Sequence, residues 1–479
     1  MNISYNWLKE YLNFSLSPEE VSAALTSIGL ETDGVEKVET IKGGLEGLVV
    51  GKVRTCVEHP DSDHLHITTV DLGDGIPTQI VCGAANVAAG QHVVVATVGT
   101  KLYDGDKEFA IKKSKIRGVE SFGMICAEDE IGVGTSHDGI IELPETVKPG
   151  TLAKDYYNVK DDYMFEVDLT PNRIDAASHF GVARDLAAWM KAQGMQADLH
   201  SPSVDAFHSD RADGAIPVEV ECQEAAIRYA GLTIRGVKVA ESPEWLRNYL
   251  TAIGQRPINN VVDITNFILN AYCQPLHCFD LAKVKGNKIV VRPAAEGSKF
   301  VTLDGVERTM TARDLMICNA EEPMCIAGVF GGLESGVTEQ TTDIFLESAC
   351  FHPTWVRKTA RRQGLNTDAS FRFERGVDPN NVIYALKAAA LLAGGEICGE
   401  ISDFYPAPVE RPTVELSLDY MSRLIGKTLD KGLVKTILAA LEMEIEKETD
   451  DVLTLRIPTY RVDVTRPCDV VEDILRIYG

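Results

Sequence analysis

The chain has 479 residues, 45% of them apolar and 25% charged, a balance typical of globular proteins and a length too great for one hydrophobic core. Its 71 acidic residues outnumber 47 basic ones and give a net charge of −24, which argues against diffuse binding to polyanions. Any nucleic-acid binding must therefore use local basic patches. We see no secretory signal or membrane span, and the 11 cysteines form no CxxC pair. We expect a cytoplasmic α+β multidomain protein with reduced thiols and no structural zinc.

The first predicted unit joins residues 1–41 to residues 151–200. Ser17 and Glu20 form a capping box with a proline at the first helical position, so a helix is expected from there to Gly29. Farther along, FEVDLT is typical of a strand, and TPNR of a turn that leads into a helix across HFGVARDLAAWMKA. This unit is predicted to be small and rich in helix.

Residues 42–150 show an all-β pattern. Short apolar or alternating runs (LVVGKVRT, LHITTVDL, QIVCG, HVVVATVG, FAIKKSKI, GMICAEDE) are separated by turn residues, and their spacing suits a small barrel. Basic residues gather in one short part of this region: Lys107, Lys112, Lys113, Lys115 and Arg117. They could line a groove that follows phosphates, or they could form a solvated strand face, which charge alone favours.

Two further units follow a polar boundary at SPSVDAFHSDRADG. Residues 212–402 mix strands (VEVEC, RYAGLTIRG, KIVVRPA) with helices and are predicted to form an α+β domain. Residues 409–479, after the linker YPAPVERP, hold a helix, the strand LTLRIP and a last helix that begins near Asp469.

Several residues in the mixed domain are candidates for chemistry, and each has an ordinary structural explanation. His277, in QPLHCFD, is by itself more typical of a packed ring than of a catalyst. Gly331 is compatible with a turn, Glu347 with a strand-end carboxylate and Thr367 with a helix cap. Arg357 and Arg361 lie at i, i+4 spacing on one side of a predicted helix, which is typical of a solvated basic face.

Taken together, the motifs resemble a known family. VGKV, HPDSDHL, VCGAANV, GTKL and KIRGVESFGMICAEDE resemble the tRNA-binding OB-fold appended to several aminoacyl-tRNA synthetases. QRPINNVVDITNFILNAYCQPLHCFD, CIAGVFGGLESGV, IFLESACFHP and RKTARRQGLNTDASFRFERGVDP resemble the editing domain of bacterial-type phenylalanyl-tRNA synthetase β subunits. NWLKEYL, TPNRIDAASHFGVARDLA and IPTYRVDVTRPCDVVEDILRIYG extend the resemblance to both flanks, in the order of the N-terminal part of that subunit.

The resemblance implies four domains. They are a helical α+β domain of residues 1–41 and 151–200, an OB-fold at 42–150, an editing domain of B3/B4 type at 212–402 and a B5-type domain at 409–479, truncated at its C-terminal end. The terminal domains would be winged-helix-like.

The implied activity is hydrolysis of tyrosine wrongly attached to tRNA(Phe), with an oriented water as the nucleophile. Glu347 matches the reader of the tyrosyl hydroxyl, and Gly331 and Ala369 match the pocket wall. Three polar residues match the same site and are the catalytic candidates: His277, Thr367 and Arg256. Cys278 stands where we expect alanine in relatives, and it is small enough to leave the pocket open.

The same resemblance implies partners and cofactors. The tRNA would contact a set of basic residues: Lys112, Lys113, Lys115, Arg117, Arg357 and Arg361. Magnesium, shared with an α subunit in an α2β2 tetramer, would be held by the acidic residues Asp463, Asp469, Glu472 and Asp473. Asp473 departs from the usual glutamate. Without the family resemblance, these acids are explained as negative charge at the start of a helix, where it complements the helix macrodipole. ATP would be used by the whole enzyme and not bound here, so this chain alone is not expected to charge tRNA.

Two rival functions differ in their requirements. A non-catalytic tRNA-binding or scaffolding chain of the synthetase predicts a filled pocket, whereas Gly331, Glu347, Thr367 and Ala369 are all of the required type. A DNA-associated protein would need a strongly basic helix, and the net charge of −24 weighs against it.

Overall fold

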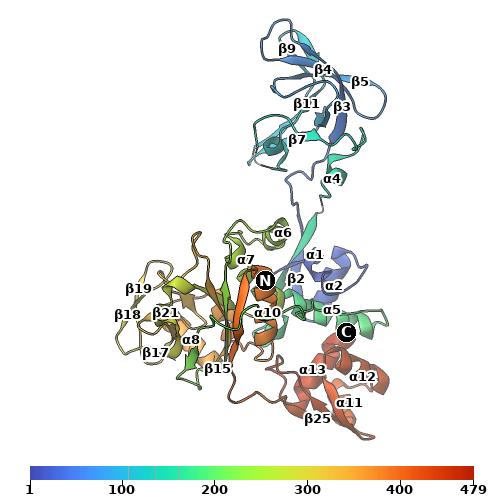
Figure 1. Ribbon diagram of the computed structural model, residues 1–479. Coiled ribbons are helices and arrows are strands. Elements are labelled where there is room, and N and C mark those ends of the chain that lie inside the picture. The colour runs from blue at the N-terminus through green and yellow to red at the C-terminus, as the bar shows by residue number, and fades with distance from the viewer. Residues whose placement is uncertain (106, 135, 160) are drawn as a thin grey trace. The chain divides into compact units, whose positions relative to one another are not determined.

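A computed structural model describes residues 1–479 except 106, 135 and 160. The chain forms two compact units. One unit combines Met1–Glu36 with Tyr163–Gly479, and the other is the intervening Lys37–Asp162 (Figure 1).

The Lys37–Asp162 unit is built on a curled antiparallel sheet. Its strands run in the order β11 (Gly123–Ile125), β6 (His92–Thr97), β3 (Leu48–Glu58), β4 (His66–Asp71) and β5 (Pro77–Cys82), with β12 (Glu142–Leu143) also paired to β6. The chain just before β11 reaches the far edge, where Phe122 N–H donates to Gln79 O at 2.9 Å. The two edges of the sheet therefore meet.

Short elements complete this unit. They are the hairpins β7 (Lys101–Asp104)–β8 (Lys107–Ala110) and β9 (Ser114–Ile116)–β10 (Val119–Ser121), and the single-turn helices α3 (Glu128–Ile131) and α4 (Ala153–Tyr156). Two predicted strands differ from the structure. The run FAIKKSKI is divided between β8 and β9. The run GMICAEDE begins in β11 and ends in α3, a helix whose first turn is entirely acidic.

The N-terminal part of the other unit places helices against a small sheet. Its elements are β1 (Asn2–Ser4), α1 (Tyr5–Leu8), α2 (Pro18–Ser27), β2 (Glu31–Val38), β13 (Asp162–Asp168), η1 (Ile174–Ala176) and α5 (His179–Ala192), with the sheet order β1-β13-β2. The predicted capping box is confirmed, because Ser17 Oγ accepts from Glu20 N–H while the Glu20 carboxylate accepts from Ser17 N–H. Helix α5 is buried along most of its length and packs against α1, α2 and α7.

The mixed region contains two sheets with a shared core. The first sheet has the order β16 (Leu276–Asp280), β23 (Ile344–Phe351), β15 (Ala226–Arg235) and β24 (Glu396–Phe404). The second has the order β14 (Val218–Val220), β17 (Ile289–Pro293), β20 (Leu315–Cys318), β21 (Pro323–Ile326) and β22 (Phe330–Gly331). Strand β23 is buried throughout. Its alternate residues therefore serve two different cores.

Helices and short connections surround these sheets. They are α6 (Glu244–Ala252), α7 (Asn260–Tyr272), η2 (Leu281–Lys283), η3 (Lys285–Asn287), the hairpin β18 (Lys299–Val301)–β19 (Glu307–Thr309), α8 (Pro353–Gln363), α9 (Asp368–Phe373) and α10 (Val382–Ala393). Helices α7 and α10 cover one face of the first sheet (Figure 1). The residues of β23 that point the other way, such as Phe345 and Ala349, join the core of the second sheet.

The C-terminal part pairs a three-stranded sheet with three helices. The elements are β25 (Thr413–Ser417), α11 (Leu418–Ile425), α12 (Lys431–Ala440), β26 (Glu444–Glu448), β27 (Val452–Arg456) and α13 (Pro467–Tyr478), with the sheet order β25-β27-β26. Helices α12 and α13 pack against α5 (Figure 1). Over the described residues, every helix is too short or too polar to span a bilayer.

Candidate functional site

Two of the predicted site residues are cross-strand neighbours. His277 of β16 lies directly opposite Glu347 of β23, so the two side chains project from the same face of the first sheet. That face is turned toward the second sheet, because the neighbouring residues Phe279 and Phe345 both belong to the core of that sheet. The residues are 70 positions apart, and only the strand pairing brings them together.

Glu347 is a buried carboxyl group with an internal phenol partner. Its side chain is only 4% exposed, and Tyr229 of β15 donates its hydroxyl to Oε2 at 2.8 Å. Burial raises the pKa of Glu347 to about 8, although the hydrogen bond from Tyr229 opposes part of that increase. The neutral acid form therefore predominates at pH 7.

His277 has a neutral ring with an open nitrogen. Its ring packs edge-on against Phe279 with 4.5 Å between the centroids, and burial lowers the pKa of His277 to about 4. Within the described part of the chain, the Nε2 atom has no hydrogen-bond partner. A buried ring nitrogen without a partner is costly unless a ligand or water completes it.

Gly331 lies against this ring. A Cβ atom at Gly331 would be 3.1 Å from His277 Cε1 and 2.9 Å from Leu303 Cδ1. The absence of a side chain thus keeps β22 close to β16. Any larger residue would displace the imidazole or Leu303.

The start of α9 is fixed to the chain segment that leads into β22. Thr367 Oγ1 accepts from Ser370 N–H at 3.1 Å, which confirms the helix-cap interpretation, and donates to Val329 O at 2.9 Å. Ala369 lies in the first turn of α9 and packs on the core of the second sheet. The hydrogen bond to Val329 therefore fixes Thr367 to the segment that leads into Gly331.

Arg256 lies at the surface, unlike Glu347. It is exposed in the loop between α6 and α7. Its neighbour Gln255 lines a cavity of about 310 Å³ together with Asp368 and Phe371 of α9. The loop therefore approaches α9. Among the described residues, no hydrogen bond or ion pair joins Arg256 to His277 or Glu347.

The predicted tRNA-binding cations fall on two surfaces, one in each unit. Lys112, Lys113, Lys115 and Arg117 are exposed on and just before the β9–β10 hairpin. Lys113 is paired with Glu120 at 2.9 Å, and Arg117 donates to Asp61 O at 2.8 Å. In the other unit, Arg357 and Arg361 are exposed on α8.

Three domain families match the sequence. The B3/4 domain family matches residues 225–398, the putative tRNA binding domain family matches 48–152 and the tRNA synthetase B5 domain family matches 414–479. The chain is 69% identical over 483 residues to a phenylalanine–tRNA ligase beta subunit from Bacteroides fragilis strain YCH46, covering 100% of this chain and 59% of that protein. The corresponding protein from Porphyromonas gingivalis strain W83 is 61% identical over 484 residues, with the same coverage.

The chain belongs to the phenylalanine–tRNA ligase beta-subunit family. It spans about three fifths of the length of these beta-subunit relatives. A solved N-terminal fragment of the phenylalanyl-tRNA synthetase beta subunit from Pyrococcus horikoshii superimposes with a TM-score of 0.36 at 18% identity, over 66% of this chain and 88% of that one.

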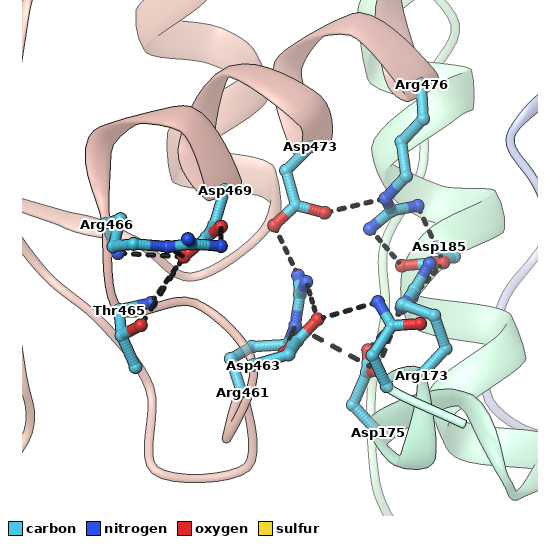
Figure 2. Close-up of polar contacts among 11 residues, drawn as sticks. Arg173, Asp175, Asp185, Arg461, Asp463, Thr465, Arg466, Asp469, Asp473 and Arg476 are labelled. Carbon is cyan, nitrogen blue, oxygen red and sulfur yellow. Dashed lines mark hydrogen bonds and ion pairs between the residues drawn. The ribbon is translucent and has the colours of Figure 1, made fainter. Parts of the chain in front are cut away.

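Three of the four acidic residues that the beta-subunit resemblance assigns to magnesium, Asp463, Asp469 and Asp473, are paired with cations and backbone groups (Figure 2). Arg461 donates two hydrogen bonds to Asp463, each 3.0 Å long. Asp473 is 2% exposed and lies between Arg461 Nη1 at 2.6 Å and Arg476 Nε at 2.7 Å. Asp469 accepts from Arg466 N–H at the start of α13, as the helix-charge interpretation predicts. Glu472 is exposed.

This arrangement does not fit a metal site. A magnesium ion needs several oxygen ligands free to converge on it, whereas Asp463 and Asp473 are held by guanidinium groups. Among the described residues, no group of three or more His, Cys, Asp and Glu side chains is placed to hold a metal.

The arginine pairs form a network between α13 and α5 (Figure 2). Arg476 donates to both oxygens of Asp185, at 2.8 and 3.1 Å, and Arg173 donates to Asp185 at 2.6 Å. Burial alone would raise the pKa of Asp185, but the guanidinium groups of Arg173 and Arg476 hold it well below its usual range. The carboxylate is therefore charged at neutral pH, and the network links two parts of the chain far apart in sequence.

Sequence reasoning missed Tyr229 and the arginine partners. Tyr229 lies in a predicted strand, RYAGLTIRG, where a buried tyrosine is typical of a core and gives no signal of a carboxylate partner. Arg461 stands close in sequence to Asp463, and Arg476 to Asp473, which was the one available sign of pairing.

Proposed function

We propose that this chain is the part of a phenylalanine–tRNA ligase beta subunit that binds tRNA(Phe) and hydrolyses tyrosine wrongly attached to it. The observation that carries the proposal is Glu347, a buried carboxyl group that already accepts a phenol hydroxyl, that of Tyr229, at 2.8 Å. It lies opposite the open nitrogen of His277 in a domain matched by the B3/4 family.

The chemical need for such a site follows from the substrates. A pocket built for phenylalanine rejects tyrosine by roughly 10²-fold only, because one added hydroxyl is weakly disfavoured. A second site with a buried polar group discriminates better, since phenylalanine would leave that group without its partner. Glu347 would supply such a group through Oε1, because Tyr229 already donates to Oε2.

The remaining residues have distinct proposed roles. Gly331 and Ala369 leave room for the tyrosyl ring, and Thr367 lies near the ester. His277 orients the attacking water through Nε2, since a ring with a pKa of about 4 is neutral but a weak base at pH 7. Arg256 contacts the tRNA end from the α6–α7 loop.

The bond changes are those of ester hydrolysis. Water oxygen adds to the tyrosyl carbonyl carbon, and the bond from that carbon to the ribose oxygen breaks. The ribose oxygen takes up one proton of the water, the second proton of the water is released to solvent, and tyrosine leaves as its carboxylate. Both polar residues of the pair, His277 and Glu347, enter the reaction uncharged at neutral pH.

The tRNA and the rest of the enzyme complete the proposal. Residues 42–150 would act as an OB-fold that binds tRNA through Lys112, Lys113, Lys115 and Arg117, and Arg357 and Arg361 would contact the acceptor end. The α subunit, in an α2β2 tetramer, would carry the ATP-dependent synthesis of Phe-tRNA in the cytoplasm. The B3/B4-type and B5-type boundaries at 212–402 and 409–479 belong to the same proposal.

The test compares deacylation of Tyr-tRNA(Phe) by full-length beta subunit assembled with its α subunit. Glu347→Ala should lower the deacylation rate by at least roughly tenfold, because it removes the hydrogen bond to the hydroxyl. Glu446→Ala, at an exposed position of β26, is the matched control and should behave as wild type. Equal rates for the Glu347 variant and the wild type would contradict the role of Glu347 and favour a scaffolding chain without a working editing site.

A further inference from the structure

Glu347 lies between polar side chains from both neighbouring strands of the first sheet. His277 of β16 is directly opposite it. On the other side, Tyr229 of β15 is paired with Ala349, two residues along β23, which makes Tyr229 the diagonal neighbour of Glu347. Diagonal neighbours in an antiparallel sheet are within reach of an aromatic side chain. Gly231, directly opposite Glu347 on β15, has no side chain to intervene, and the Tyr229 hydroxyl reaches Oε2 at 2.8 Å.

The ring of Tyr229 is fixed by the packing of the core. The residue is fully buried and belongs to the core of the second sheet, where its ring centroid lies 6.4 Å from that of Phe351. A phenol packed in this way cannot turn toward another acceptor without displacing its neighbours. Its hydroxyl is therefore a fixed point against which the Glu347 carboxyl group is oriented.

The two carboxyl oxygens of Glu347 differ in their surroundings. Oε2 accepts the hydrogen bond from Tyr229. Across the residues that the structure describes, Oε1 accepts no hydrogen bond, and it is not one of the buried polar atoms that are sealed from solvent without a partner. The carboxyl group therefore offers a ligand one oxygen, Oε1, while the other is already occupied.

The hydrogen bond from Tyr229 removes a freedom that a glutamate side chain otherwise has. The terminal torsion of glutamate is broad and nearly two-fold, so an unanchored carboxyl group samples many planes and can turn either oxygen to a ligand. A donor on a packed ring selects one plane and one free oxygen. Recognition of a hydroxyl depends on this orientation, because a hydrogen bond weakens steeply as its angle departs from linear.

We propose that Tyr229 is a positioning residue of the editing site, which sets the preference for tyrosine over phenylalanine by presenting Oε1 of Glu347 to the tyrosyl hydroxyl. This inference rests on the proposed editing function and adds the residue on which its selectivity depends. Tyr229 acts through Glu347 alone, because its ring is buried and its hydroxyl is bonded to Oε2. Loss of that hydroxyl should slow the clearance of tyrosine and not that of phenylalanine, which has no hydroxyl to place.

The test measures deacylation of Tyr-tRNA(Phe) and Phe-tRNA(Phe) by full-length beta subunit assembled with its α subunit. Tyr229→Phe keeps the ring and removes only the donor, so the ratio of kcat/KM for the tyrosyl ester to that for the phenylalanyl ester should fall by roughly tenfold. Tyr11→Phe is the matched control, because it removes a buried hydroxyl of a separate hydrophobic cluster, and it should keep the wild-type ratio. An unchanged ratio in Tyr229→Phe, or an equal fall in both rates, would overturn the proposal.

A double variant shows whether Tyr229 acts through Glu347. In a Glu347→Ala background, Tyr229→Phe should change the ratio by less than about twofold, because no carboxyl group remains to be positioned. A further tenfold fall in that background would overturn the proposal. If Glu347→Ala keeps the wild-type ratio, the editing function and this inference fail together. If Glu347→Ala loses the preference and Tyr229→Phe keeps it, the role of Tyr229 alone is wrong.

Thermal unfolding keeps the test decisive if Tyr229→Phe does not fold. The single variant leaves Oε2 as a buried acceptor without a donor, whereas replacement of both partners by apolar groups of similar shape removes that cost. Tyr229→Phe combined with Glu347→Met should therefore melt at a higher temperature than Tyr229→Phe alone. A double variant no more stable than the single one would overturn the proposal, because Glu347 would then not be the group that Tyr229 holds.

Discussion

His277 and Glu347 are titratable groups whose pKa values burial moves in opposite directions. The pKa of His277 falls to about 4 and that of Glu347 rises to about 8, so both are uncharged between those limits. An uncharged pair on one face of a sheet can accept a neutral tyrosyl group without burying a new charge. Tyr229 keeps the Glu347 carboxyl group oriented in the absence of substrate.

The raised pKa of Glu347 predicts a pH-dependent stability. In the unfolded chain the carboxyl group ionises near its ordinary value of 4.5, whereas in the folded chain it keeps its proton until about pH 8. The folded state therefore binds more protons in this window, and wild-type stability should fall as pH rises, by at most about 1.4 kcal/mol per pH unit from this group.

Glu347→Gln removes this dependence, because glutamine does not ionise. The stability of the variant relative to wild type should increase from pH 5 to pH 8, as measured by urea unfolding at each pH. The exposed Glu446→Gln should leave the pH dependence of wild type unchanged. A Glu347→Gln difference that is equal at pH 5 and pH 8 would show that the carboxyl group is not buried as described.

At the scale of elements, α5 is the helix on which the C-terminal part is built. It packs against α1, α2, α7, α12 and α13. Asp185 of α5 accepts a hydrogen bond from Arg476 of α13 (Figure 2). Arg184, also of α5, stacks on the ring of Tyr460. Charged side chains therefore supplement apolar packing between α5 and the C-terminal part.

The buried network predicts a large cost for removal of one carboxylate. Asp473→Asn leaves Arg461 and Arg476 short of a counter-charge in a buried position, and we expect destabilisation of about 3–5 kcal/mol. Asp419→Asn removes the exposed partner of Arg423 and should cost less than about 1 kcal/mol. The free energy of unfolding of each variant, measured with denaturant, gives both costs. Hydrogen exchange of the α13 amides measures the same changes at the helix. Similar costs for the two variants would mean that the network contributes little.

At the scale of the whole molecule, a net charge of −24 coexists with an exposed group of cations in the Lys37–Asp162 unit. Lys112 and Lys115 belong to this group, and no ion pair of either is present in the described residues. Local cations of this kind can attract phosphates even when the net charge is negative, although the attraction is screened by salt.

The proposed tRNA interaction therefore has a salt signature. Replacing Lys112 and Lys115 by glutamate should weaken tRNA binding and lower the slope of log K against log salt concentration by about 2, because two phosphates would no longer be neutralised. Lys447→Glu, at an exposed position of β26, should leave the slope unchanged. Titrations of fluorescent tRNA(Phe) at several salt concentrations give the slope, and an unaltered slope in the double variant would exclude this surface from the tRNA interface.

Local sequence determined much of the secondary structure. The capping box at Ser17, the cap at Thr367 and the acidic start of α13 at Asp469 each depend on residues within four positions of one another, so their hydrogen bonds can be predicted from spacing. The motifs were also sufficient to identify the beta-subunit family. The division of FAIKKSKI between two strands was not predicted, because β propensity does not mark where a hairpin turns.

The tertiary structure alone decided which groups meet. Tyr229 and Glu347 are 118 residues apart, and Asp185 and Arg476 are 291 apart, so no spacing rule connects them. The sequence supplied four acids at a spacing compatible with a metal. Folding gave Asp463 and Asp473 arginine partners instead, because a carboxylate removed from water must be matched by the charge that lies nearest in space.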